Sequence, residues 1–229
     1  MTHIIWLPGM MCDARLFTPQ LDALGGNVIV SQSHDTIEGM AQEILASAPD
    51  TFALAGLSMG GIVAMEVLRQ APERVLKVAL MDTNPKAEHP KVAAVREPQM
   101  QKAKAGQLMD VMRDEMKPHY LSDGPRRADI LGVCMDMATD LGPTVFVNQS
   151  LALQTRRDQQ DTLRNATCPA LILCGEDDAL CPIERHTLMH GLMPHSTLQV
   201  VENAGHLPTL EQPEQTTQAL QRWLEDDNG

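Results

Sequence analysis

The sequence has few basic residues and no basic run. Its 18 Lys and Arg are outnumbered by 30 Asp and Glu, which gives a formal net charge of −12. Proteins that bind a polyanion need clustered Lys and Arg. The composition therefore excludes nucleic acid as a partner, while the acidity itself mainly favours solubility and identifies no partner.

The sequence also lacks long apolar runs and a paired set of cysteines. No stretch of about 18 apolar residues occurs, as a membrane-spanning helix would need, and the segment before Pro8 has neither the basic region nor the apolar length of a signal peptide. The five cysteines are scattered and odd in number, unlike a disulfide framework. These absences predict a soluble protein of the reducing cytoplasm without membrane contact.

What is present is a regular alternation of short apolar segments with segments of helical spacing. The length of 229 residues and the apolar content of 43% are enough for one domain with one core. The predicted strands are Ile4–Leu7, Val28–Val30, Phe52–Ala55, Val75–Met81, Ala170–Cys174 and Leu198–Val201. Helical spacing follows over Thr36–Ala48, Ile62–Gln70 and Glu214–Leu224. This order predicts an α/β fold with a mostly parallel sheet of about six strands between helices.

The segment from Asn84 to Thr167 differs from the rest. It has helical-looking stretches with frequent charges and no convincing strand. We expect residues 84–167 to form a helical cap inserted into a single domain that spans residues 1–229.

A glycine-rich turn follows the predicted strand at Phe52–Ala55. It reads Gly56-Leu57-Ser58-Met59-Gly60 and leads directly into a predicted helix. A serine hydroxyl is a weak nucleophile at neutral pH, so it needs a neighbouring base and an exposed position on a sharp turn. Only small residues fit two positions before and two positions after such a serine, and glycine occupies both. Ser58 is therefore the candidate nucleophile.

This turn resembles the nucleophile elbow of the α/β-hydrolase family, and the resemblance continues in two later loops. In that family an acid and then a histidine follow the nucleophile along the chain. Here Gly175-Glu176-Asp177-Asp178 follows one predicted strand, with Pro182 a few residues on, and Ala204-Gly205-His206 follows the last one. The family spacing selects Asp178 over Asp177 as the acid and His206 as the base of a Ser-His-Asp triad.

The loop after the first predicted strand lies where the family places its oxyanion loop. Its sequence is Leu7-Pro8-Gly9-Met10-Met11-Cys12, with Pro8 in place of the usual histidine. Backbone N–H groups hold the oxyanion, so the resemblance implies Met10 and Met59 as donors, with Met11 as the alternative to Met10. The chain begins at the strand before this loop, so the first two strands of the family sheet are expected to be missing.

The resemblance implies a serine hydrolase that cleaves a small ester through an acyl-enzyme, without cofactor or metal. Cys174, Cys181 and the neighbouring acids lack the spacing of a metal site. Methionines near the predicted site and at Met109, Met112 and Met116 suit an apolar substrate, although such stripes more often belong to the core. Thioester, lactone and carbon–carbon bond hydrolysis use the same triad and stay open. A protein of another class, which binds small molecules on a hydrolase fold without catalysis, is the remaining alternative.

Overall fold

The sheet consists of six parallel strands in the order β2-β1-β3-β4-β5-β6. The computed structural model describes residues 2–226. The strands are β1 (Ile4–Leu7), β2 (Asn27–Val28), β3 (Phe52–Leu57), β4 (Val75–Met81), β5 (Ala170–Gly175) and β6 (Thr197–Val201). The predicted parallel α/β sheet is confirmed. β2 is shorter than predicted because it is an edge strand that pairs only with β1 and leaves the ladder after Ile29.

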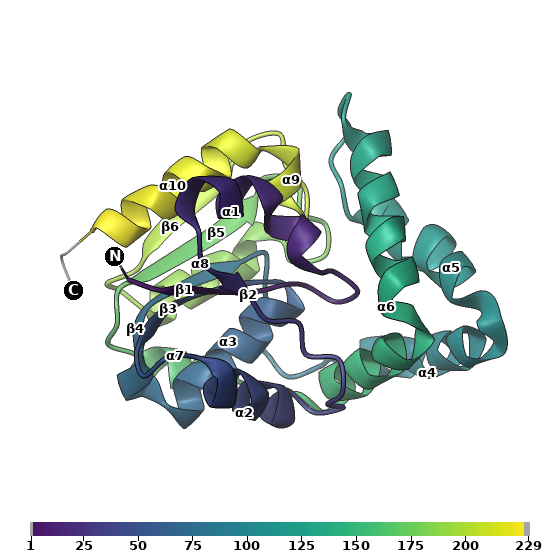
Figure 1. The fold of residues 1–229 in the computed structure, drawn as a ribbon, viewed down its shortest axis with the longest axis horizontal. Helices are drawn as coiled ribbons and strands as arrows, with labels where there is room; N and C mark the ends of the chain where they lie inside the picture. Colours follow the sequence, from purple (N-terminus) through teal and green to yellow (C-terminus); the bar gives the residue numbers. More distant parts are fainter. Residues whose placement is uncertain (1, 227–229) are drawn as a thin grey trace.

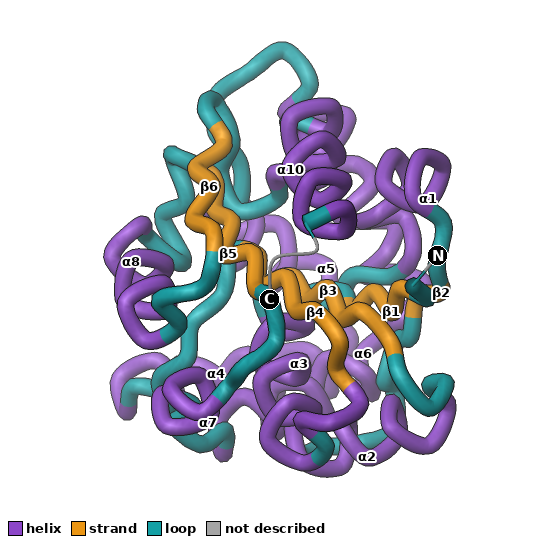
Figure 2. Tube along the Cα trace, turned by 90° about the vertical axis from the view of Figure 1, so that its left-hand side faces the viewer, coloured by secondary structure: helices purple, strands orange, loops and turns teal. Residues whose placement is uncertain are grey.

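Helices cover both faces of the sheet, as parallel strands require for their crossover connections. Figures 1 and 2 show α1 and α10 on one face and α2, α3 and α7 on the other, with α8 packed against β5 and β6. The helices that cover the sheet are α1 (Thr18–Leu24), α2 (Ile37–Ser47), α3 (Met59–Gln70), α7 (Gln160–Asn165), α8 (Ile183–Leu192), α9 (Pro208–Glu211) and α10 (Pro213–Glu225).

The strands contribute side chains to two separate cores, one on each face. Along β1, Ile5 and Leu7 join the core under α2 and α3, whereas Ile4 and Trp6 join the core under α1 and α10. This alternation follows from the two-residue period of a strand. Because both of their faces are buried, β1, β3 and β5 read as continuous apolar runs, whereas the edge strands β2 and β6 are partly exposed and contain polar residues.

The chain between β4 and β5 is helical and contains no strand in the described structure. It forms α4 (Pro90–Lys102), α5 (Leu108–Asp110) and α6 (Arg127–Thr155), which stand beside the sheet in Figure 1. Wider π-type turns cover Ala103–Gln107 and Val111–Met116, and the backbone leaves helical geometry at Gly106 (φ 85°). These breaks let short helices fold over the ends of the strands.

By length and composition alone, α6 is apolar enough to cross a membrane, which is weak evidence by itself. Its backbone is not continuously helical, because Gly142 has φ 77° and ψ 177° and Pro143 follows it. Both features break the helical ladder of hydrogen bonds. α6 packs against α4, α5, α2 and α9, and 33% of its most apolar 18-residue window is buried.

Candidate active site

Ser58 lies on a sharp turn between β3 and α3. Its backbone has φ 55° and ψ −115°, a conformation that L-residues rarely adopt, and its N–H donates to the Met81 carbonyl at 2.9 Å. A Cβ at Gly56 would lie 2.3 Å from the Gly60 oxygen, and one at Gly60 would lie 1.9 Å from the Leu7 oxygen. Only glycine fits these positions, and the packing around them holds the strained serine in place.

Ser58, His206 and Asp178 lie in one hydrogen-bonded row. The Ser58 hydroxyl is 2.9 Å from Nε2 of His206, and Nδ1 of His206 is 2.8 Å from Oδ2 of Asp178. The three residues come from the ends of three strands, β3, β5 and β6, at the same edge of the parallel sheet. His206 and Asp178 are buried, whereas Ser58 is half-buried and reaches the pocket.

Asp178 is held as an anion by its surroundings. Burial by itself raises the pKa of this carboxyl, but the His206 ring and the N–H groups of Cys181 and Leu180 outweigh burial and hold the pKa below its usual value. Those N–H groups donate to Oδ1 at 2.8 Å from Leu180 and 3.0 Å from Cys181, which leaves Oδ2 for His206. Asp177 is exposed, and among residues 2–226 only its backbone N–H is engaged, with the Ala204 carbonyl.

Glu211 organises the loop that carries His206. Its carboxylate accepts N–H groups from Gly205, Leu207 and Ser122 at 2.9–3.0 Å. The N–H of His206 itself donates to the Tyr120 carbonyl at 2.7 Å, and the Tyr120 ring packs edge-on against the imidazole. The imidazole is therefore fixed from the loop and from the helical segment together.

Two backbone N–H groups beside Ser58 have no acceptor within residues 2–226. They belong to Met59, the first residue of α3, and to Met10 in the loop after β1. The N–H of Met11 is occupied, because it donates to Oε1 of Gln149 on α6 at 2.9 Å. This occupancy favours Met10 over Met11 as a free donor.

Asp82, at the end of β4, is a further acidic group that the sequence did not single out. One carboxylate oxygen accepts the Gly175 N–H at 2.9 Å, while the other is buried without a partner among the described residues. Burial raises the pKa of Asp82 well above its usual value, and the neighbouring Asp178 carboxyl raises it further. Both effects favour the neutral form of Asp82 beside Asp178.

Thr83 and His186 hold the turn at Ser58 through two hydrogen bonds. The Thr83 hydroxyl donates to the Ser58 carbonyl at 2.7 Å, and the Thr83 N–H donates to Nε2 of His186 at 3.2 Å. Burial lowers the pKa of His186 to about 4, so its ring stays neutral and accepts this hydrogen bond at neutral pH. The sequence offered no signal for this pair, because neither residue is part of a motif.

The possible ligand atoms of Asp178, Cys181 and His206 lie within 4.8 Å of one another. A metal ion there would need a thiolate, yet burial raises the pKa of Cys181 well above its usual value. It would also have to displace the bond between Asp178 and His206. The donor set suits proton transfer from serine better than metal binding.

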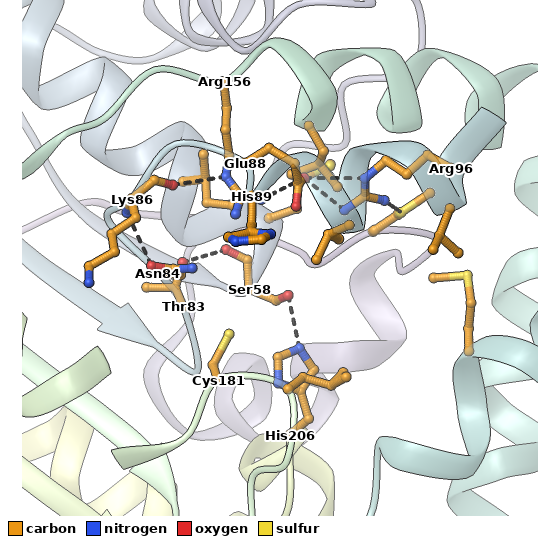
Figure 3. A pocket seen from close by; sticks show the side chains of 18 of the residues that line it. Ser58, Thr83, Asn84, Lys86, Glu88, His89, Arg96, Arg156, Cys181 and His206 are labelled. Carbon is orange, nitrogen blue, oxygen red and sulfur yellow. Dashed lines mark hydrogen bonds and ion pairs between the residues drawn. The ribbon is translucent and has the colours of Figure 1, made fainter. Parts of the chain in front are cut away.

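Ser58 opens into a cavity of about 810 Å³ between the sheet and the helical segment. Met10, Met59 and Met116 line it, whereas Met112 is fully buried in the core. Figure 3 shows Ser58 and His206 facing each other, with a set of charged side chains on the far side of Ser58. The cavity is thus apolar in part and strongly charged in part.

The sequence as a whole matches known hydrolases. The model of the alpha/beta hydrolase family matches residues 9–219. A pimeloyl-[acyl-carrier protein] methyl ester esterase of Salmonella newport is 28% identical over 190 residues, which cover 81% of this chain and 74% of that protein. The biotin biosynthesis bifunctional protein BioHC of Teredinibacter turnerae is 24% identical over 83% of this chain, but the match spans only 36% of that longer protein.

Solved structures share the whole fold. A thermophilic esterase from Thermogutta terrifontis superimposes with a TM-score of 0.89 at 26% identity and covers 98% of this chain and 90% of its own. An enol-lactonase from Burkholderia xenovorans reaches a TM-score of 0.87 at 18% identity over 99% of this chain and 92% of its own, a likeness of fold alone.

Proposed function

The chain belongs to the alpha/beta hydrolase family as an esterase-type hydrolase, and we propose that Ser58, His206 and Asp178 are its catalytic triad. The observation that carries the proposal is the row of hydrogen bonds from the Ser58 hydroxyl through His206 to Asp178, at 2.9 and 2.8 Å, at the mouth of the large cavity. A base within this distance can take the hydroxyl proton as the oxygen attacks.

In the first half of the reaction, Ser58 Oγ attacks the ester carbonyl while its proton moves to Nε2 of His206. Asp178 stabilises the imidazolium by accepting the Nδ1 proton in a hydrogen bond. Collapse of the tetrahedral intermediate breaks the bond to the alcohol, which leaves with the proton from His206. Water then attacks the acyl-enzyme in the same way, and the acid and free Ser58 are released.

The negative charge on the tetrahedral oxygen needs donors that are already in place. Met10 and Met59 supply two N–H groups without partners in the described structure, and that of Met59 lies at the N-terminus of α3, where the helix dipole favours negative charge. Loss of one such donor typically costs a factor of about 10²–10³ in turnover. Met10 is therefore the proposed partner of Met59, and Met11 is not.

We propose an ester of a small alcohol as the substrate. The Salmonella relative is named as a methyl ester esterase, and a cavity of about 810 Å³ leaves room for an acyl part of considerable size. Esters and thioesters of graded acyl length, assayed side by side, distinguish the bond that is cleaved.

A serine-reactive fluorophosphonate followed by peptide mass spectrometry tests the nucleophile. We expect one adduct, on the peptide that contains Ser58, together with turnover of p-nitrophenyl acetate. Ser58→Ala is the matched control and should show neither. If the natural sequence gave no adduct and no turnover above that control, the esterase proposal would be wrong.

A further inference from the structure

The cavity at Ser58 is positively charged although the protein as a whole is acidic. Four cationic side chains line it, those of Lys86, Arg96, Arg156 and Arg185, against two acidic ones, Glu88 and Glu115. The charge of Glu115 is already paired with Lys102, which does not line the cavity, at 2.6 Å. A chain with a net charge of −12 thus places an excess of positive charge around its candidate active site.

The excess is concentrated where two arginines share one carboxylate. Oε2 of Glu88 accepts hydrogen bonds from Nη2 of Arg96 and Nη1 of Arg156, both at 3.1 Å. The three side chains are only 14%, 9% and 4% exposed for Arg96, Arg156 and Glu88. One carboxylate cannot neutralise two guanidinium groups, so one positive charge remains uncompensated at a site with little water.

Arg156 also has N–H donors that are unused within residues 2–226. Its Nε donates to the Lys86 carbonyl at 3.0 Å, while Nη2 has no acceptor within the described residues. Burial lowers the pKa of Arg156, and the charges of Arg96 and Arg185 act in the same direction against Glu88. An anion that enters the cavity would relieve this cost.

The arginine pair lines the same cavity as Ser58. Nη1 of Arg96 is 3.8 Å from the thioether sulfur of Met10, whose backbone N–H is a proposed oxyanion donor. In Figure 3, Arg96, Glu88 and Arg156 lie on one side of Ser58, and His206 lies on the other. A substrate held at Ser58 therefore has the arginine pair along one wall of its cavity.

We propose that the ester hydrolysed here carries an anionic group, a carboxylate or a phosphate, which Arg96 and Arg156 bind. The inference rests on the proposed esterase function and specifies its substrate. A planar guanidinium fork matches the oxygens of either anion. Because the net charge of the protein repels anions at long range, this recognition acts locally, inside the cavity.

Pairs of esters that differ only in charge test the proposal. We compare kcat/KM for monomethyl esters of linear dicarboxylic acids with the dimethyl esters of the same acids. A third set carries a phosphate at the far end of the acyl chain. Charge-assisted hydrogen bonds predict a preference for one anionic set of roughly 10- to 100-fold. The anionic set with the larger preference identifies the group.

Arg156→Gln and Arg96→Gln should each reduce the ratio of anionic to neutral ester turnover towards one. Arg157→Gln is the matched control, because Arg157 is half-exposed, pairs with Glu38 and does not line the cavity. Its ratio should equal that of the natural sequence. Thermal unfolding of each variant separates loss of recognition from loss of fold.

Three outcomes decide the matter. Equal kcat/KM for anionic and neutral esters in the unaltered protein overturns the inference but leaves the esterase function standing. A preference that survives in both arginine variants also overturns it. Failure to cleave any ester, with Ser58 unlabelled by fluorophosphonate, refutes the proposed function itself.

Discussion

Replacement of Asp178 by Asn tests the proton relay at a single atom. Oδ1 of Asp178 accepts the N–H groups of Leu180 and Cys181, and Oδ2 faces Nδ1 of His206. In Asp178→Asn the amide oxygen keeps the two backbone donors, so the amide NH2 group is turned towards Nδ1. Nδ1 must then accept, the ring proton moves to Nε2, and Nε2 can no longer take the proton of Ser58.

The size of the effect follows from the loss of the correct tautomer. A misplaced imidazole proton in a Ser-His-Asp triad lowers kcat by about 10⁴, which corresponds to about 5 kcal/mol of transition-state stabilisation. Asp177→Asn is the control, because the Asp177 side chain is exposed and makes no hydrogen bond within residues 2–226. We expect it to change kcat by less than about twofold, as for surface substitutions.

The assay is steady-state hydrolysis of p-nitrophenyl acetate, with the rate of fluorophosphonate labelling of Ser58 as a second readout. Both rates should fall together in Asp178→Asn, while thermal unfolding still shows a cooperative transition. Equal losses in the Asp177 and Asp178 variants would refute the tautomer argument. A larger loss in the Asp177 variant would assign the acid to that residue.

Gly60→Ala should destabilise the fold by about 1–3 kcal/mol in urea unfolding, as overpacking does, because its Cβ would lie 1.9 Å from the Leu7 oxygen. Gly132→Ala in α6 is the control, because a Cβ at Gly132 would meet no atom within 4 Å, and this variant should be neutral or slightly stabilising. Equal changes in stability for the two glycine variants would contradict the packing argument. Asp82→Asn should gain stability relative to the natural sequence as pH rises above about 4. Above that pH the Asp82 carboxyl ionises in the unfolded chain but keeps its proton in the folded state, so the folded state of the natural sequence is destabilised, and Asn removes this penalty. A gain that shrank between pH 4 and pH 7 would argue against a neutral Asp82.

The turn at Ser58 could be read from the sequence because its requirements are local. Gly56 and Gly60 are needed by contacts within a few residues and with the neighbouring β1, so their spacing is visible in the chain. The loop of His206 likewise has its stabilising acid, Glu211, five residues further on. Family resemblance alone distinguishes Asp178 from Asp177 as the acid, because two adjacent aspartates have the same chemistry and nothing local in the sequence separates them.

Other parts of the site depend on contacts between distant segments. Asp82 lies beside Asp178 only because β4 and β5 are neighbours in the sheet, although the whole helical segment separates them in sequence. Arg96 and Arg156 meet at Glu88 because α4 and the end of α6 come together. Helix packing of this kind leaves no short-range pattern in the sequence. The positive φ angles of Gly106 and Gly142 also break the helical geometry of the segment, which a regular helical spacing does not predict.

The predicted methionine stripe shows why helical spacing failed here. Met109, Met112 and Met116 share a face of an ideal helix, yet only Met116 lines the cavity. The π-type turn over Val111–Met116 contains more than 3.6 residues per turn, so Met112 in the core and Met116 at the cavity no longer share one face. The stripe therefore gives little support to an apolar substrate, whereas Arg96 and Arg156 line one wall of the cavity.

The helical segment between β4 and β5 also acts on the chemistry. Gln149 on α6 is buried and occupies the N–H of Met11, which leaves the N–H of Met10 without an acceptor in the described structure. Arg96 on α4 contacts the side chain of the same Met10. Because one loop is held from both helices, a shift of this segment would move the proposed oxyanion donor and the proposed anion site together. If the two proposals hold, Met10 physically links substrate recognition to transition-state stabilisation.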